Sequence, residues 1–215
     1  MKKQEIEEII FSNQFHTIFE PIVDIQNRTI YGYESLTRLS GKNQPSIGSF
    51  IAECSDYELT ADFEIQTLKN AFQAFSFDPD TYLFVNLSYR TFLDSFSKIA
   101  DLIRTTKRKV VFEFLETSEL NPEILTELRP KTAQLSAELD TQFAIDDFGS
   151  GYADVSRILT QPADFVKTDA AFLEDITRLK GKQLVLINLF HFVRHKNKTL
   201  IVEGVEEKKT ARLLN

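Results

Sequence analysis

Short apolar runs of the strand type alternate with longer helical segments along most of this chain. Only a three-residue polar turn, 26–28, joins the first two runs, so these two require an antiparallel hairpin. Helical segments separate the later runs, which is typical of parallel crossover units. The seven runs lie at 17–25, 29–39, 81–88, 109–116, 142–148, 163–169 and 199–206. The pattern predicts an α/β fold, a TIM-like (β/α)8 barrel with an antiparallel first strand, of which this chain lacks the eighth strand and the last helix.

Apolar residues three or four positions apart, together with residues that begin or break helices, indicate where the helical segments lie. Asn121, followed by a proline, should begin one helix. Pro130 should divide that helix, because proline lacks the amide hydrogen that a helix interior uses. Gly181 should interrupt the last long helical segment. The expected helices are 5–15, 65–75, 92–103, the region after Asn121, 153–160 and the segment around Gly181.

No linker, repeat or low-complexity stretch divides the 215 residues. We therefore expect one barrel domain over 1–215, opened by a leading helix within 1–15. The last residues, 206–215, have a helical pattern, whereas closing a barrel would require an eighth strand. Because an uncovered strand edge favours unwanted pairing, we expect either that the native chain continues past Asn215 or that a partner chain covers the edge.

The composition argues against several classes of protein. A net charge of −7 and a pI of about 5.1 disfavour binding to DNA or RNA polymers. The single cysteine, Cys54, allows no internal disulfide and is typical of a reducing compartment. Three glutamates within the first eight residues disfavour a signal peptide, and the most apolar segment, 184–193, is short and broken by polar residues. We expect a cytoplasmic location and no membrane segment.

Each predicted strand after the first ends in or near a polar side chain. These side chains are Glu34, Asn86, Glu113, Asp146 with Asp147, Lys167 and Glu203. In a barrel the ends of these strands all meet on one face, where active sites of this architecture lie. Five carboxylates and one ammonium in one pocket would carry a net charge of about −4, which two divalent cations would balance.

The chemistry of these side chains indicates which cations they would bind. Carboxylate and amide oxygens are the ligands that Mg²⁺ and Mn²⁺ prefer, whereas a zinc site would use cysteine or histidine. Paired ions about 3.5–4 Å apart are a recurring device for phosphoester hydrolysis. Taken alone, Asp146 and Asp147 have a simpler interpretation as a turn and a helix cap. The agreement of six successive strands favours the metal site.

With these residues identified, the chain resembles the EAL-domain family of cyclic di-GMP phosphodiesterases. The family's name-giving Glu-Ala-Leu is here Glu34-Ser35-Leu36, and the matching blocks cover nearly the whole chain in order. They are FEPIVDIQNRTIYGYESLTR (19–38), VNLS (85–88), FEFLETS (112–118), DDFGSGY (146–152), KTD (167–169) and EGVEE (203–207).

The resemblance implies a role for each matching polar residue at the strand ends. It implies two Mg²⁺ or Mn²⁺ ions per site, with Asp146 bridging them. The implied ligands are Glu34, Asn86, Glu113 and Asp146 for the first ion, and Asp147 and Glu203 for the second. Lys167 is implied beside the attacking water. The residues implied to act in the chemical step are Glu34, Asp147, Lys167 and Glu203.

The resemblance also implies the substrate, cyclic di-GMP, and a homodimer as the assembly. Contacts with the substrate are implied for Glu20, Leu36 and Arg38, where the guanidinium of Arg38 would hold a phosphate. Support from behind the ligands is implied for Glu116 and Asp169. One departure adds charge: Glu20 stands where the family usually has glutamine. The family's eighth strand also carries a functional glutamine that this chain lacks.

Two functions of different classes follow from these observations. The first is a metal-dependent phosphodiesterase that hydrolyses cyclic di-GMP to linear 5′-pGpG by a two-metal mechanism, which the filled ligand positions through Glu203 favour. The second is a cyclic di-GMP sensor with little or no turnover, which the missing eighth strand favours. A purely structural barrel would not explain five converging carboxylates.

Overall fold

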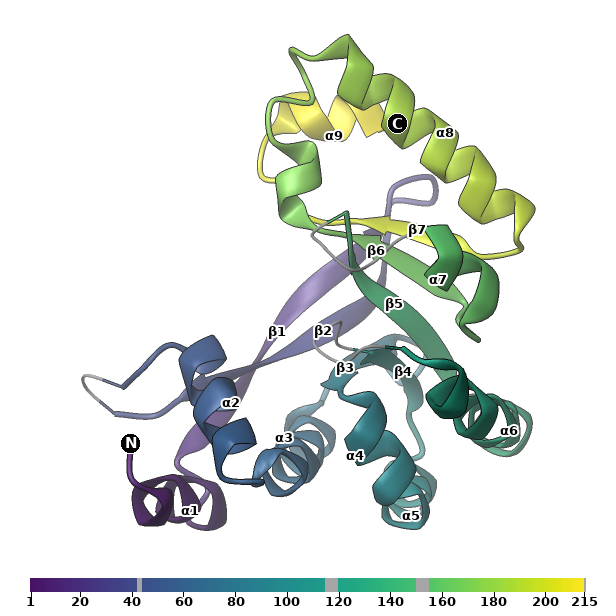
Figure 1. The fold of residues 1–215 in the computed structure, drawn as a ribbon. Coiled ribbons are helices and arrows are strands. Elements are labelled where there is room, and N and C mark those ends of the chain that lie inside the picture. Colours follow the sequence, from purple (N-terminus) through teal and green to yellow (C-terminus); the bar gives the residue numbers. More distant parts are fainter. Residues whose placement is uncertain (42–43, 115–119, 150–154, 215) are drawn as a thin grey trace. The chain divides into compact units, whose positions relative to one another are not determined.

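A computed structural model of the chain describes residues 1–41, 44–114, 120–149 and 155–214. Figure 1 labels the helices and strands along the chain. The chain divides into two compact units, the first comprising 1–24 and 29–111 and the second comprising 25–28 and 112–215. Strands follow one another in the mixed sheet in chain order, from β1 to β7. The α/β class and the seven predicted strands are thereby confirmed for the described part of the chain.

The first unit contains a hairpin, a third strand and the helices that pack on them. Its elements are α1 (Lys3–Phe11), β1 (Phe15–Asp24), β2 (Thr29–Leu39), α2 (Ile47–Asp56), α3 (Thr60–Ala74), β3 (Tyr82–Leu87), α4 (Tyr89–Asp94), α5 (Phe96–Thr106) and the start of β4 (Lys109–Phe114). The expected leading helix, 5–15, was too long. It ends at Phe11, because Asn13 adopts a positive φ of 54° and Phe15 already pairs with Leu39.

The predicted antiparallel hairpin is confirmed. Its register places Glu20 opposite Glu34 and His16 opposite Arg38. β2 then pairs in parallel with β3, with Gly32 opposite Tyr82. A Cβ atom on Gly32 would lie 2.5 Å from the Tyr82 carbonyl oxygen, so only glycine permits this close approach of the two strands.

Apolar side chains of α1, α2 and α3 form one core of the first unit. This core includes Ile6, Ile9, Ile10, Phe15, Phe50, Cys54, Leu59 and Phe63. The rings of Phe50 and Phe63 meet edge to face with their centroids 5.2 Å apart. The single helix expected over 92–103 is two helices, because Ser95 leaves helical geometry and α5 begins at Phe96.

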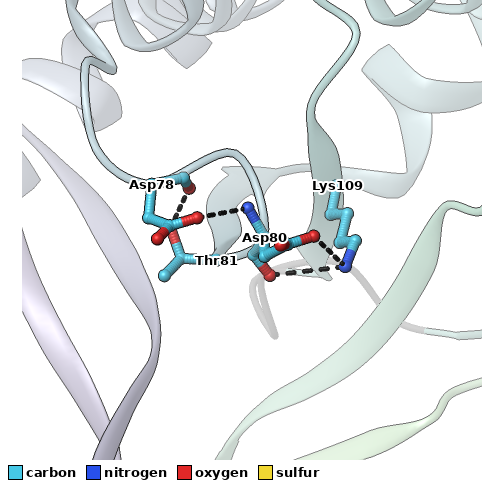
Figure 2. Close-up of polar contacts among 4 residues, drawn as sticks. All are labelled: Asp78, Asp80, Thr81 and Lys109. Atoms are coloured by element: carbon cyan, nitrogen blue, oxygen red, sulfur yellow. Dashed lines mark hydrogen bonds and ion pairs between the residues drawn. The ribbon is translucent and has the colours of Figure 1, made fainter.

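A polar turn precedes β3 (Figure 2). The Asp80 amide donates to Asp78 Oδ1 at 2.9 Å, and the Thr81 hydroxyl donates to the Asp78 carbonyl at 2.7 Å. Lys109, the first residue of β4, reaches Asp80 Oδ1 at 3.2 Å. Because Asp80 is 92% exposed, this ion pair contributes little to stability, and the local turn bonds fix the entry to β3.

The second unit contains three parallel strands in addition to the end of β4. Its further elements are α6 (Pro122–Leu139), β5 (Gln142–Phe148), α7 (Val155–Thr160), β6 (Phe165–Thr168), the 3-10 helix η1 (Ala170–Leu173), α8 (Lys180–His195), β7 (Thr199–Val202) and α9 (Lys208–Leu214). β5 pairs with β6 and β6 with β7, all in parallel. The predicted bounds of β5 are confirmed.

Two expected helix breaks in this unit are wrong. Pro130 lies inside one continuous helix, α6, on its exposed side. There the carbonyl left without an amide partner can bond water, which lowers the cost of the proline. Gly181 lies in the first turn of α8, where the amide has no partner within the helix in any case. None of the described helices is long and apolar enough to cross a membrane.

Candidate active site

A buried lysine organises the polar strand ends of the second unit. The Nζ atom of Lys167, on β6, lies 2.7 Å from Glu113 Oε1, 2.7 Å from Glu203 Oε1 and 3.2 Å from Asp146 Oδ1. The side chains of Lys167 and Glu113 are 1% and 0% exposed. A buried ammonium is costly unless it is paired, so these three carboxylates account for its presence. The structure thus brings together these four of the predicted strand-end residues.

A β-bulge shapes the end of β5, where the two adjacent aspartates lie. Ile145 pairs with Val166 and Phe148 with Thr168, so β5 has one residue more than β6 over this stretch. Asp147 has a positive φ of 55°, and its amide donates to Asp146 Oδ1 at 3.0 Å. In a regular strand, neighbouring side chains point to opposite faces. The bulge breaks that alternation and thus allows two consecutive carboxylates to serve one site.

Glu203 follows directly after β7 and is the most exposed member of the cluster, at 29%. The next residue, Gly204, has a positive φ of 73°. A Cβ atom there would also lie 2.9 Å from the Cβ of Ala170. The chain therefore requires glycine to turn away immediately after the carboxylate.

Two predicted ligands lie together in the first unit. The Asn86 side-chain amide, on β3, lies 3.3 Å from Glu34 Oε1, on β2. Both side chains are half-buried. Glu20 lies directly opposite Glu34 in the β1–β2 register and is exposed. Like charges facing each other on neighbouring strands repel, so Glu20 adds negative charge beside a predicted ligand.

The residues expected to contact substrate share one face of the hairpin. Glu34, Leu36 and Arg38 alternate along β2 and therefore point to the same side. Leu36 is half-buried and Arg38 is exposed, with its Nη1 donating to the Thr37 carbonyl at 3.0 Å. Since Glu20 faces Glu34, it belongs to the same face.

Two further predicted positions complete the set. Asp169 begins the 3-10 helix η1, where its Oδ1 accepts from the Ala171 amide at 2.6 Å, and so it acts as a cap. Glu116 lies outside the described residues, and its supporting role stays a prediction.

The sequence reasoning missed a buried carboxylate that accepts hydrogen bonds from Ser88, two residues after Asn86. Glu64, on α3, is 6% exposed and accepts from the Ser88 hydroxyl at 2.8 Å and from the Ser88 amide at 3.2 Å. Burial raises the pKa of this carboxyl, and hydrogen bonds from Thr91 and Ser88 partly oppose that rise. A signal existed, because Glu64 shares the buried stripe of Leu68 and Ala71 at helical spacing.

The donor chemistry of the Lys167 cluster suits a divalent cation. Its three carboxylates outnumber the ammonium, which leaves two negative charges in excess within contact distance. Carboxylate oxygens are the preferred ligands of Mg²⁺ and Mn²⁺. Over the described ranges, no three acidic, histidine or cysteine side chains meet around one point that would hold a metal ion. Glu113, Asp146 and Glu203 are instead directed at the Lys167 ammonium.

Comparisons with known proteins identify the family of this chain. The family model described as "EAL domain" matches residues 3–215. The cyclic di-GMP phosphodiesterase PdeF of Escherichia coli (strain K12) is 24% identical over 215 residues, which are 95% of this chain and 28% of PdeF. The chain thus spans less than a third of that relative's length.

Solved structures share the fold. The cGMP-bound EAL enzyme Bd1971 superposes with a TM-score of 0.84 at 21% identity, over 98% of this chain and 60% of that one. The EAL domain of FimX from Pseudomonas aeruginosa, bound to c-di-GMP, gives a TM-score of 0.83 at 21% identity, over 98% of this chain and 88% of that one. The family model covers nearly every residue, and we conclude that this chain belongs to the EAL domain family.

Proposed function

We propose that this chain hydrolyses cyclic di-GMP to linear 5′-pGpG with the help of two divalent cations. The observation that carries the proposal is the buried Lys167, held within 2.7–3.2 Å of Glu113, Asp146 and Glu203. Membership of the EAL family supports it, as do a relative named as a cyclic di-GMP phosphodiesterase and a structural neighbour that binds c-di-GMP.

The proposed ligands are Glu34, Asn86, Glu113, Asp146, Asp147 and Glu203, with Mg²⁺ or Mn²⁺ as the cations. Bound cations would polarise the phosphate and lower the pKa of an attacking water. The excess negative charge around Lys167 supports this assignment, because a divalent cation would neutralise it.

The proposed reaction cleaves one P–O bond of cyclic di-GMP. The water oxygen gives up a proton and bonds to phosphorus while the P–O3′ bond breaks, and the leaving 3′-oxygen takes up a proton, so that no net proton is gained or lost in the step. Three carboxylates hold the Lys167 ammonium in place through ion pairs. There it would stabilise the negative charge on the attacking oxygen. Arg38 would hold a phosphate through its guanidinium. Leu36 and Glu20 lie on the same hairpin face and would contact the nucleotide.

A sensor that binds cyclic di-GMP with little turnover is the second candidate. The observation that favours it is that three of the proposed ligands, Glu113, Asp146 and Glu203, are ion-paired with the Lys167 ammonium. The ammonium competes with a cation for these carboxylates, and a site that holds its cations weakly would turn over little of the nucleotide that it binds.

One experiment separates the two functions. Purified protein is incubated with cyclic di-GMP and either Mg²⁺ or Mn²⁺, and the products are resolved by chromatography. We expect linear 5′-pGpG with either metal and none in excess chelator, and we expect Ca²⁺ to substitute poorly because its coordination is larger and looser. Nucleotide binding by calorimetry without any product would favour the sensor instead. Light scattering tests the predicted homodimer on the same sample.

A further inference from the structure

The 3-10 helix η1, Ala170–Leu173, contacts the strand end that bears the two aspartates. The Asp169 amide, just before η1, donates to the Phe148 carbonyl at 3.1 Å. The ring of Phe172 lies against Gly149, since a Cβ atom placed there would be 3.0 Å from Phe172 Cδ2. Phe148 and Gly149, which follow the two aspartates, therefore contact η1 and the residue just before it.

The first residue of the same short helix contacts the other proposed ligand strand. Ala170 lies so close to Gly204 that a Cβ atom on Gly204 would come within 2.9 Å of its Cβ and 3.1 Å of its Cα. Gly204 is the residue after Glu203. One four-residue helix thus supports the turns behind Asp146, Asp147 and Glu203.

A lysine from α8 fastens η1 in place. The Nζ atom of Lys182 donates to the Glu174 carbonyl at 2.6 Å and to the Ala171 carbonyl at 3.3 Å. Gly149, Phe172 and Lys182 also line one cavity of ≈ 410 Å³, so the turn, η1 and the start of α8 meet at one place. Lys180, two residues earlier on α8, is exposed and offers a matched comparison.

These contacts matter because the residues they support repel one another. Asp146 and Glu203 both form ion pairs with Lys167, and Asp147 is the next residue after Asp146. The ends of the two strands therefore carry negative charges at short range. A functional site has to be held to within about 0.5 Å, and a displacement of about 1 Å can cost about 10²-fold in rate.

We propose that η1 is a brace that holds the two ligand-bearing strand ends at a fixed separation, with Phe172 and Lys182 as its positioning residues. The role rests on the proposed metal-dependent function. Neither residue touches the reacting atoms. Phe172 acts through the turn at Gly149, and Lys182 acts through the carbonyl groups of η1.

Hydrogen exchange followed by mass spectrometry tests the brace without any catalysis. The parent is compared with Lys182→Met, Phe172→Leu and the control Lys180→Met, at a temperature where all four are folded by circular dichroism. We expect faster exchange in both 142–149 and 199–206 for Lys182→Met and Phe172→Leu, and parental exchange for Lys180→Met. Parental exchange at both strand ends in Lys182→Met and Phe172→Leu overturns the proposal.

Binding of Mn²⁺ distinguishes positioning from a merely structural role. The free-ion electron paramagnetic resonance signal gives the half-saturating Mn²⁺ concentration without requiring turnover. We expect Lys182→Met to raise it about tenfold and Lys182→Arg to restore most of the affinity, because a ~1 Å error in ligand placement weakens the site. A value equal to that of Lys180→Met overturns the positioning role. Absence of cyclic di-GMP hydrolysis by the parent would refute the proposed function, whereas the hydrogen-exchange comparison needs neither metal nor substrate and would still decide whether η1 braces the strand ends.

Discussion

Lys167 Nζ lies 2.7 Å from Glu113 Oε1, and both side chains are almost completely buried. Such a pair is costly to desolvate, and it is rarely the most stable way to fill a core. Glu203 and Asp146 add two further ion pairs to the same ammonium. The cluster therefore indicates a site where charge is needed for function.

Replacement of Lys167 by methionine should destabilise the protein strongly. The change leaves three carboxylates close together without their counter-charge, and breaking a buried ion pair in this way costs about 3–5 kcal/mol. Urea unfolding without added metal measures the effect. Addition of Mg²⁺ or Mn²⁺ should recover part of the loss.

The matched control is Lys109→Met, which removes the lysine of the exposed pair with Asp80 (Figure 2). An exposed pair of this kind contributes about 1 kcal/mol or less. Similar losses of stability in the two variants would contradict the description of Lys167 as the centre of a buried charge cluster.

Replacement of Glu20 by glutamine should stabilise the hairpin and tighten nucleotide binding. Glu20 faces Glu34 across the β1–β2 pair, and removing one of two opposed like charges gains about 0.2–1 kcal/mol. Thermal unfolding and calorimetric titration with cyclic di-GMP measure the two effects. Glu8→Gln, at an exposed position of α1, controls for the loss of one negative charge. Equal changes in both variants would show that only net charge matters.

The stability of the protein should depend on pH through Glu64. Burial raises the pKa of this carboxyl above its ordinary value of 4.5, against hydrogen bonds from Thr91 and Ser88. Between the unfolded and folded pKa values the folded protein binds more protons. The contribution of Glu64 to stability is therefore fully present below about pH 4.5 and is lost as the pH rises through the raised pKa.

Glu64→Gln removes this titration. The stability of the variant relative to the parent should rise between pH 4 and pH 8, as measured by urea unfolding across that range. The exposed Glu127, on α6, provides Glu127→Gln as a control for the loss of one carboxylate. A relative stability of Glu64→Gln that stays constant with pH would show that Glu64 does not titrate in this way.

The thiol of Cys54 should be unreactive in the folded protein. Burial, together with the charges of Glu53 and Glu64, raises its pKa to about 12. Because the thiolate is the reactive form, native protein at pH 8 should resist iodoacetamide over hours, and denatured protein should be alkylated rapidly. Mass spectrometry of both samples decides the matter, and rapid labelling of the native sample would contradict the burial of α2 against α1 and α3.

Much of the fold could be predicted because apolar runs and short connections specify strands directly. β5 follows from the run Gln142–Phe148, and the hairpin follows from a connection too short for a parallel crossover. Pro130 was misinterpreted, because the cost of a proline depends on whether the carbonyl it deprives of a partner reaches water. That exposure is a property of the packed helix and is absent from the local sequence.

In the candidate site, too, some features could be predicted from the sequence and others depend on tertiary packing. The sequence indicated which residues end the strands, and the structure brings three of them, Glu113, Asp146 and Glu203, together around a fourth, Lys167. The positive φ of Asp147 could not be predicted, because the bulge depends on the pairing of β5 with β6. Glu64 was missed because a single carboxylate on the apolar face of a helix does not reveal its partner. The structure shows that this partner is Ser88, whose hydroxyl donates to Glu64.

The most direct test of the account is the rate of cyclic di-GMP hydrolysis by Asp147→Asn beside the parent. If Asp147 serves the second metal, the isosteric change removes one negative oxygen donor, and the rate should fall by about 10²-fold or more. Nucleotide affinity and melting temperature should stay near the parental values, because asparagine also tolerates the positive φ of this position. If Asp147 only completes a turn, the two rates should agree within about twofold, because asparagine suits turns about as well as aspartate. That result would contradict the two-metal site.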